Sequence, residues 1–552
     1  MGNFSSINRR ETLQSLRDKQ YDLLVIGGGI TGAGIGLDAS KRGLQTAVIE
    51  MQDFAAGTSS RSTKLVHGGL RYLAQAEVKL VAEVGKERKI VYENGPHVTT
   101  PEWMMLPFYQ GGTFGPFTTN IALRVYDFLA GVKKNERRKM LSKEEALHRE
   151  PLLEGNGLKG AGYYVEYKTD DARLTIEVVK KAVETGVTAA NYVQAVDFVY
   201  EAGKIVGVVA EDKIDGERFT IKANKVINAT GPWVDNLRDM DGSKQGKTLH
   251  LTKGVHLVFT HEDFPLDQAI YFDSQDHRMI FAIPRDGKTY VGTTDTFYEA
   301  DTAHPTVTEA DRDYILQAIN RMFPSLQLTE EKVDSSWAGV RPLISQDGKN
   351  PSEISRKDEI FISESGLYSM AGGKLTGYRK MAEEVVDKVT ESIKHDSGII
   401  FSKVSTEHTP ISGGDVGGSK GFVTFKQNKQ EEGLALGMNA EQVAYLIQLY
   451  GSNVDIVFEL YEQYKATAAE ENLDPVVLAM LEYALQYEAV YKPVDFLIRR
   501  TAGLFFNYDW VINWKDAVIT YMTKRLNWTK EQKTEYTKEL DELIKEARHA
   551  EA

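Results

Sequence analysis

The 552-residue sequence predicts an α/β protein with three parts: one built on a parallel sheet, one rich in antiparallel strands, and a helical C-terminal part. Three observations carry this prediction. Residues 21–50, YDLLVIGGGITGAGIGLDASKRGLQTAVIE, have the pattern of a buried strand, a glycine-rich turn, a helix and a second strand. Residues 225–235 and 366–389 each start as an apolar strand that ends in small residues. After the glycines at 413–418 the pattern turns helical, with Asn439 and Thr529 as expected helix caps.

Composition narrows the class of protein. The length suggests about three or four domain-sized units. A net charge of −13 argues against general nucleic-acid binding, although a local basic site could hold a small anion. The chain has no cysteine, which excludes disulfides, thiolate metal sites and cysteine nucleophiles, so redox chemistry would need an organic cofactor or another kind of metal site. We find no apolar signal core and no run of about 18 apolar residues, and therefore expect a cytoplasmic protein or one at a membrane surface.

The turn after the first strand has the GxGxxG spacing of dinucleotide-binding folds. Gly27 permits the tight turn, Gly29 lets backbone approach a pyrophosphate, and Gly32 allows close helix packing. Glu50 ends the second strand about 20 residues further on, where a carboxylate accepts ribose hydroxyls. The alternative, a glycine-rich turn in an unrelated parallel sheet, lacks this context.

Two later segments favour FAD over NAD. A dinucleotide unit at the N-terminus, followed by a basic glycine-containing segment, is similar to the glutathione-reductase and amine-oxidase class of FAD-binding folds, in which the chain returns to the cofactor. Residues 225–235, KVINATGPWVD, would supply small residues beside it. Residues 366–389 place a glycine turn before a helix, whose N-terminus would favour the negative charge of a reduced flavin.

Eight motifs give the sequence a family resemblance. They are GGGITGAG at 27–34, TSSRSTKLVHGGLRYL at 58–73, TDDARL at 169–174, NATGPWVD at 228–235, KGVHLVF at 253–259, VGTTDT at 291–296, GVRPL at 339–343 and GGKLTGYRK at 372–380. In this order they resemble the FAD-dependent glycerol-3-phosphate dehydrogenases of the respiratory type. DFLIRRT at 495–501 is similar to the family's helical extension, a fainter match. The resemblance implies oxidation of sn-glycerol 3-phosphate to dihydroxyacetone phosphate, with electrons passed to a quinone. The glycerophosphate oxidases, which use oxygen, share nearly all these motifs and stay as the alternative.

The matching motifs predict the residues that contact FAD. These are Gly27, Gly29, Ile30, Thr31, Gly32, Glu50, Thr58, Ser59, Ser62, Lys64, Leu65, His67, Gly68, Ala229, Thr230, Gly231, Gly373, Lys374, Leu375 and Thr376. The resemblance implies noncovalent FAD, with His67 lining the flavin. The positive charge of the segment around Lys64 is expected to meet the pyrophosphate and the flavin. No metal site is predicted.

Flavin oxidation of a secondary alcohol needs a base near the substrate hydroxyl. Strand alternation in KGVHLVF puts His256 on the face opposite Val255 and Leu257. Its ordinary pKa of about 6.5 suits a base near neutrality. The alternative is a buried structural histidine, and Lys374 is a second candidate for assisting the base or tuning the flavin.

A phosphorylated substrate also needs fixed cations, and arginine suits phosphate because its planar fork donates two parallel hydrogen bonds. Arg341 and Arg356 are the arginines of two matching segments, although a surface ion pair is the usual alternative for any one arginine. The resemblance adds Arg71, Tyr72 and Lys374. The predicted catalytic residues are His256, Arg341, Lys374 and Arg71, and the predicted substrate-binding residues are Arg71, Tyr72, His256, Arg341, Arg356 and Lys374.

The positions of the FAD-binding and substrate-binding motifs divide the chain into three domains. We expect a discontinuous FAD-binding domain at 18–80, 150–240 and 360–395, a substrate-binding domain at 81–149 and 241–359, and a helical domain at 400–552. An apolar group precedes a basic cluster within 112–139, as a membrane-surface contact requires, although a core helix with a solvated loop explains it equally well. The apolar residues are Phe114, Phe117, Ile121, Phe128 and Leu129, and the basic ones Lys133, Lys134, Arg137, Arg138 and Lys139. A homodimer and a peripheral position on the cytoplasmic face of the cell membrane are further expectations.

Overall fold

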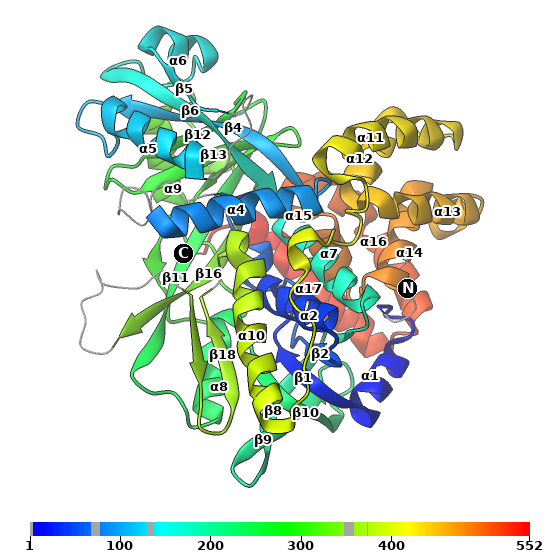
Figure 1. Ribbon diagram of the computed structural model, residues 1–552. Helices are drawn as coiled ribbons and strands as arrows, with labels where there is room; N and C mark the ends of the chain where they lie inside the picture. The colour runs from blue at the N-terminus through cyan, green and yellow to red at the C-terminus, as the bar shows by residue number, and fades with distance from the viewer. Residues whose placement is uncertain (1–3, 68–77, 130–136, 347–357, 373, 552) are drawn as a thin grey trace.

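A computed structural model describes residues 4–67, 78–129, 137–346, 358–372 and 374–551 (Figure 1). Two sheets and a group of C-terminal helices make up the molecule. The predicted glycine-rich turn, the later strands and the helical end all appear where the sequence places them, so the predicted fold class is confirmed.

The first sheet is parallel at its centre. Its parallel strands run in the order β18 (Leu367–Ala371), β10 (Arg218–Asn228), β1 (Gln20–Ile26), β2 (Thr46–Ile49) and β7 (Thr188–Ala190). Antiparallel β17 (Glu359–Ile362) extends one edge, and the meander of β8 (Val193–Glu201) and β9 (Lys204–Asp212) joins β10. The apolar runs of β1 and β2 are explained by burial, because parallel strands are covered on both faces.

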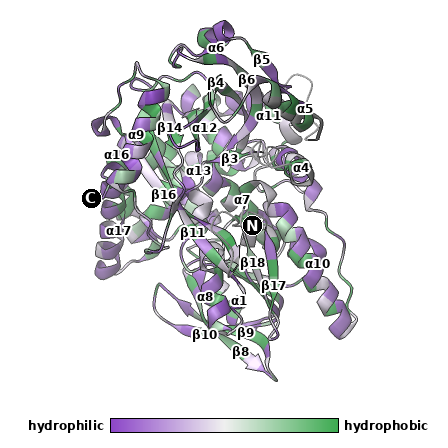
Figure 2. Ribbon diagram, turned by 90° about the vertical axis from the view of Figure 1, so that its left-hand side faces the viewer, coloured by the Kyte–Doolittle hydropathy of each residue, from purple (hydrophilic) through white to green (hydrophobic). Residues whose placement is uncertain are grey.

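Helices cover this sheet and bring distant segments together. They include α1 (Arg9–Asp18), α2 (Ile30–Arg42), α7 (Asp171–Glu184), α8 (Val234–Met240) and α10 (Tyr378–Ser397). Hydrophobic and hydrophilic residues alternate along α10 in Figure 2, as expected of a helix with one buried face. Its buried side includes Met381, Val385 and Val389, the apolar positions that the sequence pattern predicts for this helix.

The second sheet has ten strands, in the order β15 (Thr296–Phe297), β11 (Lys247–Thr260), β14 (Lys288–Gly292), β13 (Met279–Arg285), β12 (Ala269–Asp273), β4 (Thr99–Tyr109), β6 (Leu158–Thr169) and β3 (Leu65–Val66), with β16 (Ser335–Gln346) on β11 and β5 (Lys139–Leu141) on β6. Helices α4 (Val78–Asn94), α5 (Pro116–Leu129), α6 (Lys143–Arg149) and α9 (Glu309–Met322) accompany it. The sheet is antiparallel except where β4 pairs with β12. Strands β3 and β6 fall within the ranges assigned above to the FAD-binding domain but pair in this sheet, because alternation along a strand does not identify its partner.

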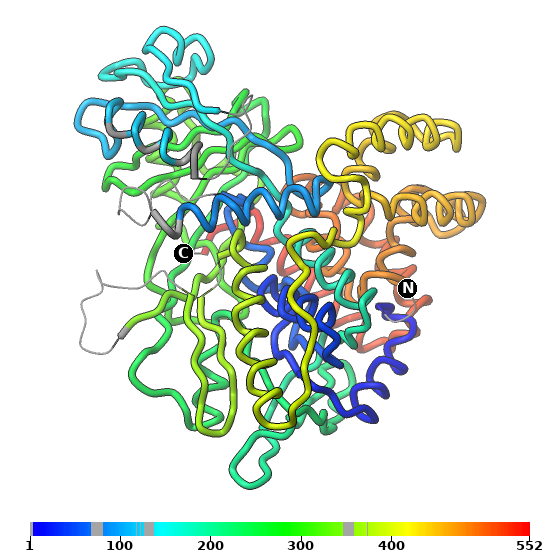
Figure 3. The backbone as a smooth tube through the Cα atoms, viewed as in Figure 1, coloured from blue at the N-terminus to red at the C-terminus, as the bar shows by residue number. Residues whose placement is uncertain are grey.

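The C-terminal part is helical. It contains α11 (Gly418–Ala435), α12 (Ala440–Tyr450), α13 (Val454–Tyr464), α14 (Pro475–Tyr487), the π-helical turn η10 (Asp495–Arg500), α15 (Gly503–Phe506), α16 (Tyr508–Leu526) and α17 (Lys530–Arg548). The capping boxes at Asn439 and Thr529 are present, as the sequence predicts. The first described residues, from Phe4, lie against these helices (Figure 3), where the Ser6 amide donates to the Leu485 carbonyl at 3.1 Å.

The predicted membrane patch is partly described. Helix α5 exposes Phe117 and Ile121, 78% and 49% of whose surface faces solvent, while it buries Leu123. Arg138 donates to the side-chain oxygen of Asn120 at 3.0 Å, so this residue of the basic cluster lies against the helix. Lys133 and Lys134 lie outside the described residues, as do the side chains of Phe128 and Leu129. None of the described helices is both long and apolar enough to cross a bilayer.

Candidate functional site

One cavity of about 540 Å³ runs past the carboxyl ends of the parallel strands toward the second sheet. It starts at Ile26, the last residue of β1, at Glu50 after β2 and at Ala229 after β10, and it reaches Gly254 and Arg341 on β11 and β16. Ligands of doubly wound folds bind outside the carboxyl ends of the strands, because the loops that leave them diverge there. The cavity therefore joins the predicted nucleotide site to the predicted substrate site.

The glycine-rich turn has a conformation that only glycine allows. Gly27 has φ of +112°, and a Cβ built on it would lie 2.5 Å from the Ala229 carbonyl oxygen. A Cβ on Gly32 would lie 1.8 Å from the carbonyl oxygen of Gly27. Gly29, Ile30 and Thr31 line the cavity at the start of α2, whose first turn has no acidic residue. This end of the helix fits a pyrophosphate.

Glu50 lies at the edge of the turn with its carboxylate held in place. One oxygen accepts the Gly28 amide at 2.7 Å and the other accepts the Gln52 amide at 2.8 Å. Burial raises the pKa of the Glu50 carboxyl group, and these backbone donors oppose that shift. Each carboxylate oxygen has a lone pair left for a ribose hydroxyl, so the geometry fits the predicted role.

The basic segment after β2 divides between the cavity and the core. Thr58, Ser59, Ser62, Leu65 and His67 line the cavity. Lys64 is absent from that lining, since its buried ammonium donates to Asp171 at 2.6 Å and to the Ser60 carbonyl at 2.9 Å. Its charge is neutralised within the protein, contrary to the expectation that it meets the cofactor. A phosphate would have to find its cations elsewhere.

The remaining predicted cofactor residues come from two later segments of the chain that lie beside the same cavity. Ala229, Thr230 and Gly231 line the cavity after β10, and Lys374, Leu375 and Thr376 line it ahead of α10. The His67 amide donates to the Thr376 hydroxyl at 3.1 Å, which joins the basic segment to this turn. Gly68 and Gly373 lie outside the described residues. The lining thus unites four segments that are far apart in sequence.

Arg61 lines the same cavity and was missed by the sequence analysis. Burial, together with the neighbouring charge of Arg499, lowers the pKa of the Arg61 guanidinium to about 10. Among the described residues we find no hydrogen-bonded or ion-pair partner for it. A half-buried cation that lines a cavity without a counter-ion favours an anionic ligand. The signal in the sequence was its place inside the TSSRSTKL segment.

The far end of the cavity is cationic. The Arg341 guanidinium donates to the Thr293 hydroxyl at 3.0 Å and lies 3.9 Å from the Asp295 carboxylate. Gly254 leaves room for it, because a Cβ there would lie 2.7 Å from Arg341 Nη2. Burial lowers the pKa of His67, and the positive charges of Arg341 and Lys374 contribute to that shift. Both cations therefore lie close enough to affect the His67 side chain. Arg71, Tyr72 and Arg356 lie outside the described residues.

His256 is behind the cavity wall rather than in it. Its side chain is 1% exposed and stacks on Trp337 with ring centroids 4.8 Å apart. Nε2 is 3.0 Å from the hydroxyl oxygen of Thr63, and Thr63 lines the cavity. Burial lowers the pKa of His256 well below its ordinary value, and Arg341 and Lys64 lower it further. The imidazole is therefore neutral near pH 7 and reaches the cavity through one hydroxyl group.

The matching protein families and relatives agree with this site. Residues 22–378 match the FAD-dependent oxidoreductase family, and residues 404–533 match the C-terminal domain of alpha-glycerophosphate oxidase. The chain is 58% identical to an aerobic glycerol-3-phosphate dehydrogenase of Bacillus subtilis, covering 99% of this chain and 98% of that protein. It is 56% identical to the enzyme of the same name from Staphylococcus haemolyticus, with 98% of each covered.

Solved structures give the same result. The glycerol-3-phosphate dehydrogenase of Bacillus halodurans, in complex with FAD, superposes with a TM-score of 0.87 at 49% identity over 99% of both chains. An L-alpha-glycerophosphate oxidase of Mycoplasma pneumoniae shares the fold, with a TM-score of 0.55 and 16% identity over 70% of this chain and 96% of that one. The chain therefore belongs to the family of FAD-dependent glycerol-3-phosphate dehydrogenases, and FAD is its cofactor.

Proposed function

We propose that the protein oxidises sn-glycerol 3-phosphate to dihydroxyacetone phosphate and passes the electrons to a quinone. The observation that carries the proposal is the pair of cations, Arg341 and Lys374, that line the same cavity as the glycine-rich turn and both lower the pKa of His67. A small phosphorylated alcohol needs such cations, and the alcohol carbon then lies toward the cofactor. The names of the relatives support this substrate.

The chemistry divides between the cofactor and the chain. A bound FAD would supply the acceptor for the hydride of the alcohol carbon. The phosphate binds Arg341 and Lys374, assisted by Arg71, Tyr72 and Arg356 from segments whose structure is not described. The hydroxyl proton passes to Thr63 Oγ1 while the proton of Thr63 passes to His256 Nε2. This relay needs the His256 tautomer protonated at Nδ1, and the 3.0 Å between Nε2 and the Thr63 hydroxyl oxygen is within hydrogen-bond reach for the proton transfer.

The FAD pocket of the proposed enzyme has its own set of contacts. Gly29, Ile30 and Thr31 would hold the pyrophosphate at the start of α2, and Glu50 the ribose. Arg61 is the cation that we expect to replace Lys64 beside the cofactor's negative charge.

Anaerobic reduction tests the reaction and the acceptor together. Adding glycerol 3-phosphate to the purified holoenzyme without oxygen should bleach the oxidised flavin absorbance. The reduced enzyme is then mixed with a quinone analogue or with air, and we expect the quinone to reoxidise it much faster. Flavin that stays oxidised would contradict the proposed substrate, whereas faster reoxidation by air, with hydrogen peroxide formed, would establish the oxidase instead. The oxidase is the second candidate because residues 404–533 match a domain described for that enzyme.

A membrane contact would bring the enzyme to its quinone. We propose that α5 and the basic residues after it form this contact on the cytoplasmic face, since Phe117 and Ile121 are exposed beside Arg138. Each basic residue near an anionic surface adds about 1 kcal/mol. Replacing Lys133, Lys134, Arg137, Arg138 and Lys139 by glutamine should therefore abolish sedimentation with anionic vesicles.

The control for this variant lowers the charge elsewhere. It replaces the exposed Lys420, Lys426, Lys465, Lys530 and Lys538 by glutamine and should leave vesicle binding nearly unchanged. Equal loss in both variants would mean that net charge alone governs binding, and no loss in the first would mean that the contact lies elsewhere.

A further inference from the structure

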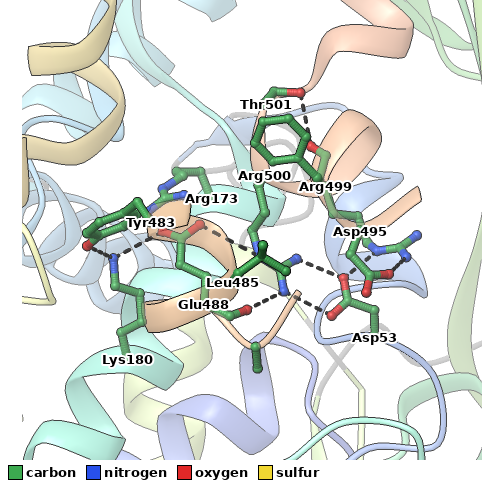
Figure 4. Close-up of polar contacts among 12 residues, drawn as sticks. Asp53, Arg173, Lys180, Tyr483, Leu485, Glu488, Asp495, Arg499, Arg500 and Thr501 are labelled. Carbon is green, nitrogen blue, oxygen red and sulfur yellow. Dashed lines mark hydrogen bonds and ion pairs between the residues drawn. The ribbon is translucent and has the colours of Figure 1, made fainter. Parts of the chain in front are cut away.

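A network of buried charges joins the FAD-binding part to the C-terminal helices (Figure 4). Its four carboxylates and four cations are Asp53, Glu177, Glu488, Asp495, Arg173, Lys180, Arg499 and Arg500. None is more than 8% exposed. Arg173 pairs with Glu177 and Glu488, and Lys180 donates to the Tyr483 hydroxyl at 2.8 Å. The charges balance, as burial in a low dielectric requires.

Asp53 is the member of the network that lies within a cavity-lining loop, between Gln52 and Ala55. Its carboxylate accepts both terminal nitrogens of Arg500, at 2.7 and 2.9 Å, and Arg499 Nε at 2.6 Å. The Asn191 amide group donates to it as well, at 3.0 Å. Although burial alone would raise the pKa of Asp53, the two arginines lower it below its ordinary value, so the carboxylate stays charged. Three of its four hydrogen bonds come from η10 of the C-terminal domain.

The loop that carries Asp53 has two faces. Met51, Gln52, Ala55 and Ala56 line the cavity, whereas Asp53 is fully buried on the other side. Phe54 packs beneath the glycine-rich turn, where a Cβ on Gly28 would lie 2.5 Å from its ring. Backbone hydrogen bonds also hold this loop, among them those from the Tyr192 amide to the Gln52 carbonyl at 2.8 Å and from the Ala55 amide to the Gly28 carbonyl at 3.3 Å. The buried carboxylate of Asp53 is thus the group through which the C-terminal domain directly attaches to a cofactor-lining loop.

The turn η10, which carries Arg499 and Arg500, is itself held by hydrogen bonds within the C-terminal domain. Arg499 also donates to Asp495 at 2.6 Å, and the other oxygen of Asp495 accepts the Tyr491 and Lys492 amides at 2.9 and 2.8 Å. Arg500 donates to the Glu488 carbonyl at 2.7 Å. The guanidinium groups therefore reach Asp53 with their orientation already set, which lowers the entropy lost in ordering the loop.

We propose that Arg499 and Arg500 of the C-terminal domain position the loop at residues 50–57 for FAD, through Asp53. The affinity for FAD then depends on a domain that contributes no residue to the described lining of the cavity. Arg499 and Arg500 are positioning residues, because they act on FAD only through the loop. If the loop is not held, FAD must order it on binding, and that cost is subtracted from the binding free energy.

Two variants test the proposal on the full-length holoenzyme. Asp53→Asn keeps the size of the side chain but removes its charge, and Arg499→Lys keeps the charge but cannot reach both Asp53 and Asp495. The dissociation constant for FAD is measured by diluting the holoenzyme and following the flavin fluorescence released. We expect it to rise at least tenfold for Asp53→Asn and less for Arg499→Lys.

The control is another fully buried carboxylate of the C-terminal domain. Glu482 accepts the Tyr521 hydroxyl at 2.6 Å and Arg525 at 2.8 Å, all within that domain. Glu482→Gln should lower the unfolding temperature in saturating FAD while leaving the FAD dissociation constant within about twofold, as expected of a stability effect without loop contact.

A second measurement keeps the proposal falsifiable if Asp53→Asn folds poorly. Hydrogen exchange of the amides at 51–57 should be faster in FAD-free Arg499→Lys than in the FAD-free wild type, with exchange in α14 little changed. The proposal is overturned if Arg499→Lys binds FAD as the wild type does with the loop equally protected. It is also overturned if Glu482→Gln weakens FAD binding as much as the loop variants do.

Discussion

Replacing Thr63 by valine is expected to slow flavin reduction about a hundredfold or more at saturating glycerol 3-phosphate. Valine has the shape of threonine but no hydroxyl group, so the path from the substrate to His256 Nε2 is broken. A positioned general base typically contributes about 10²- to 10⁴-fold. His256→Ala should cost about as much, and the double variant little more, because the two residues serve one proton transfer. Anaerobic stopped-flow absorbance measures the rate.

Thr63→Ser is the matched control, since serine keeps the hydroxyl group and should retain most of the rate. The dependence on pH gives a second check. Burial lowers the pKa of His256 well below 6.5, with a smaller contribution from Arg341 and Lys64, so the base is already deprotonated at neutral pH. The rate should fall only as the pH drops well below 6.5. A wild-type rate in Thr63→Val would exclude the relay and leave Lys374 as the candidate base.

Replacing Arg341 by alanine should lower kcat/KM for glycerol 3-phosphate by about 10- to 150-fold, since hydrogen bonds to a charged group contribute about 1.5–3 kcal/mol. Arg341→Lys should recover part of the loss, because lysine keeps the charge but not the planar fork. Steady-state rates with a quinone analogue give these values.

Glycerol, which lacks the phosphate, separates binding from chemistry. Its slow oxidation should be nearly the same in Arg341→Ala and the wild type. Arg218→Ala removes an exposed arginine that pairs with Glu211 on the first sheet, outside the cavity lining, and should leave both substrates unaffected. If Arg341→Ala lost activity equally with glycerol, Arg341 would act on the reacting carbon or on the fold rather than on the phosphate.

The nucleotide-binding half of the site was predictable from the sequence. Gly27 and Gly32 are required by the backbone of one short turn, and the strands around them are apolar because a parallel sheet is buried on both faces. Such requirements are local, so contiguous residues reveal them. The order of the later motifs then sufficed to assign the family and its cofactor, which the comparisons confirm.

Charges and hydrogen bonds between distant segments could not be predicted in this way. Lys64 pairs with Asp171, 107 residues away, and the predicted base His256 meets Thr63 across 193 residues. Asp53 is held by Arg499 from 446 residues further along the chain. The alternation along β11 predicted that His256 lies on the face opposite Val255 and Leu257. It could not predict that Thr63 would lie between that face and the cavity. A sequence pattern reports the face on which a side chain lies, whereas the partner of a buried charge depends on which distant elements pack against that face, and only the folded chain brings these together.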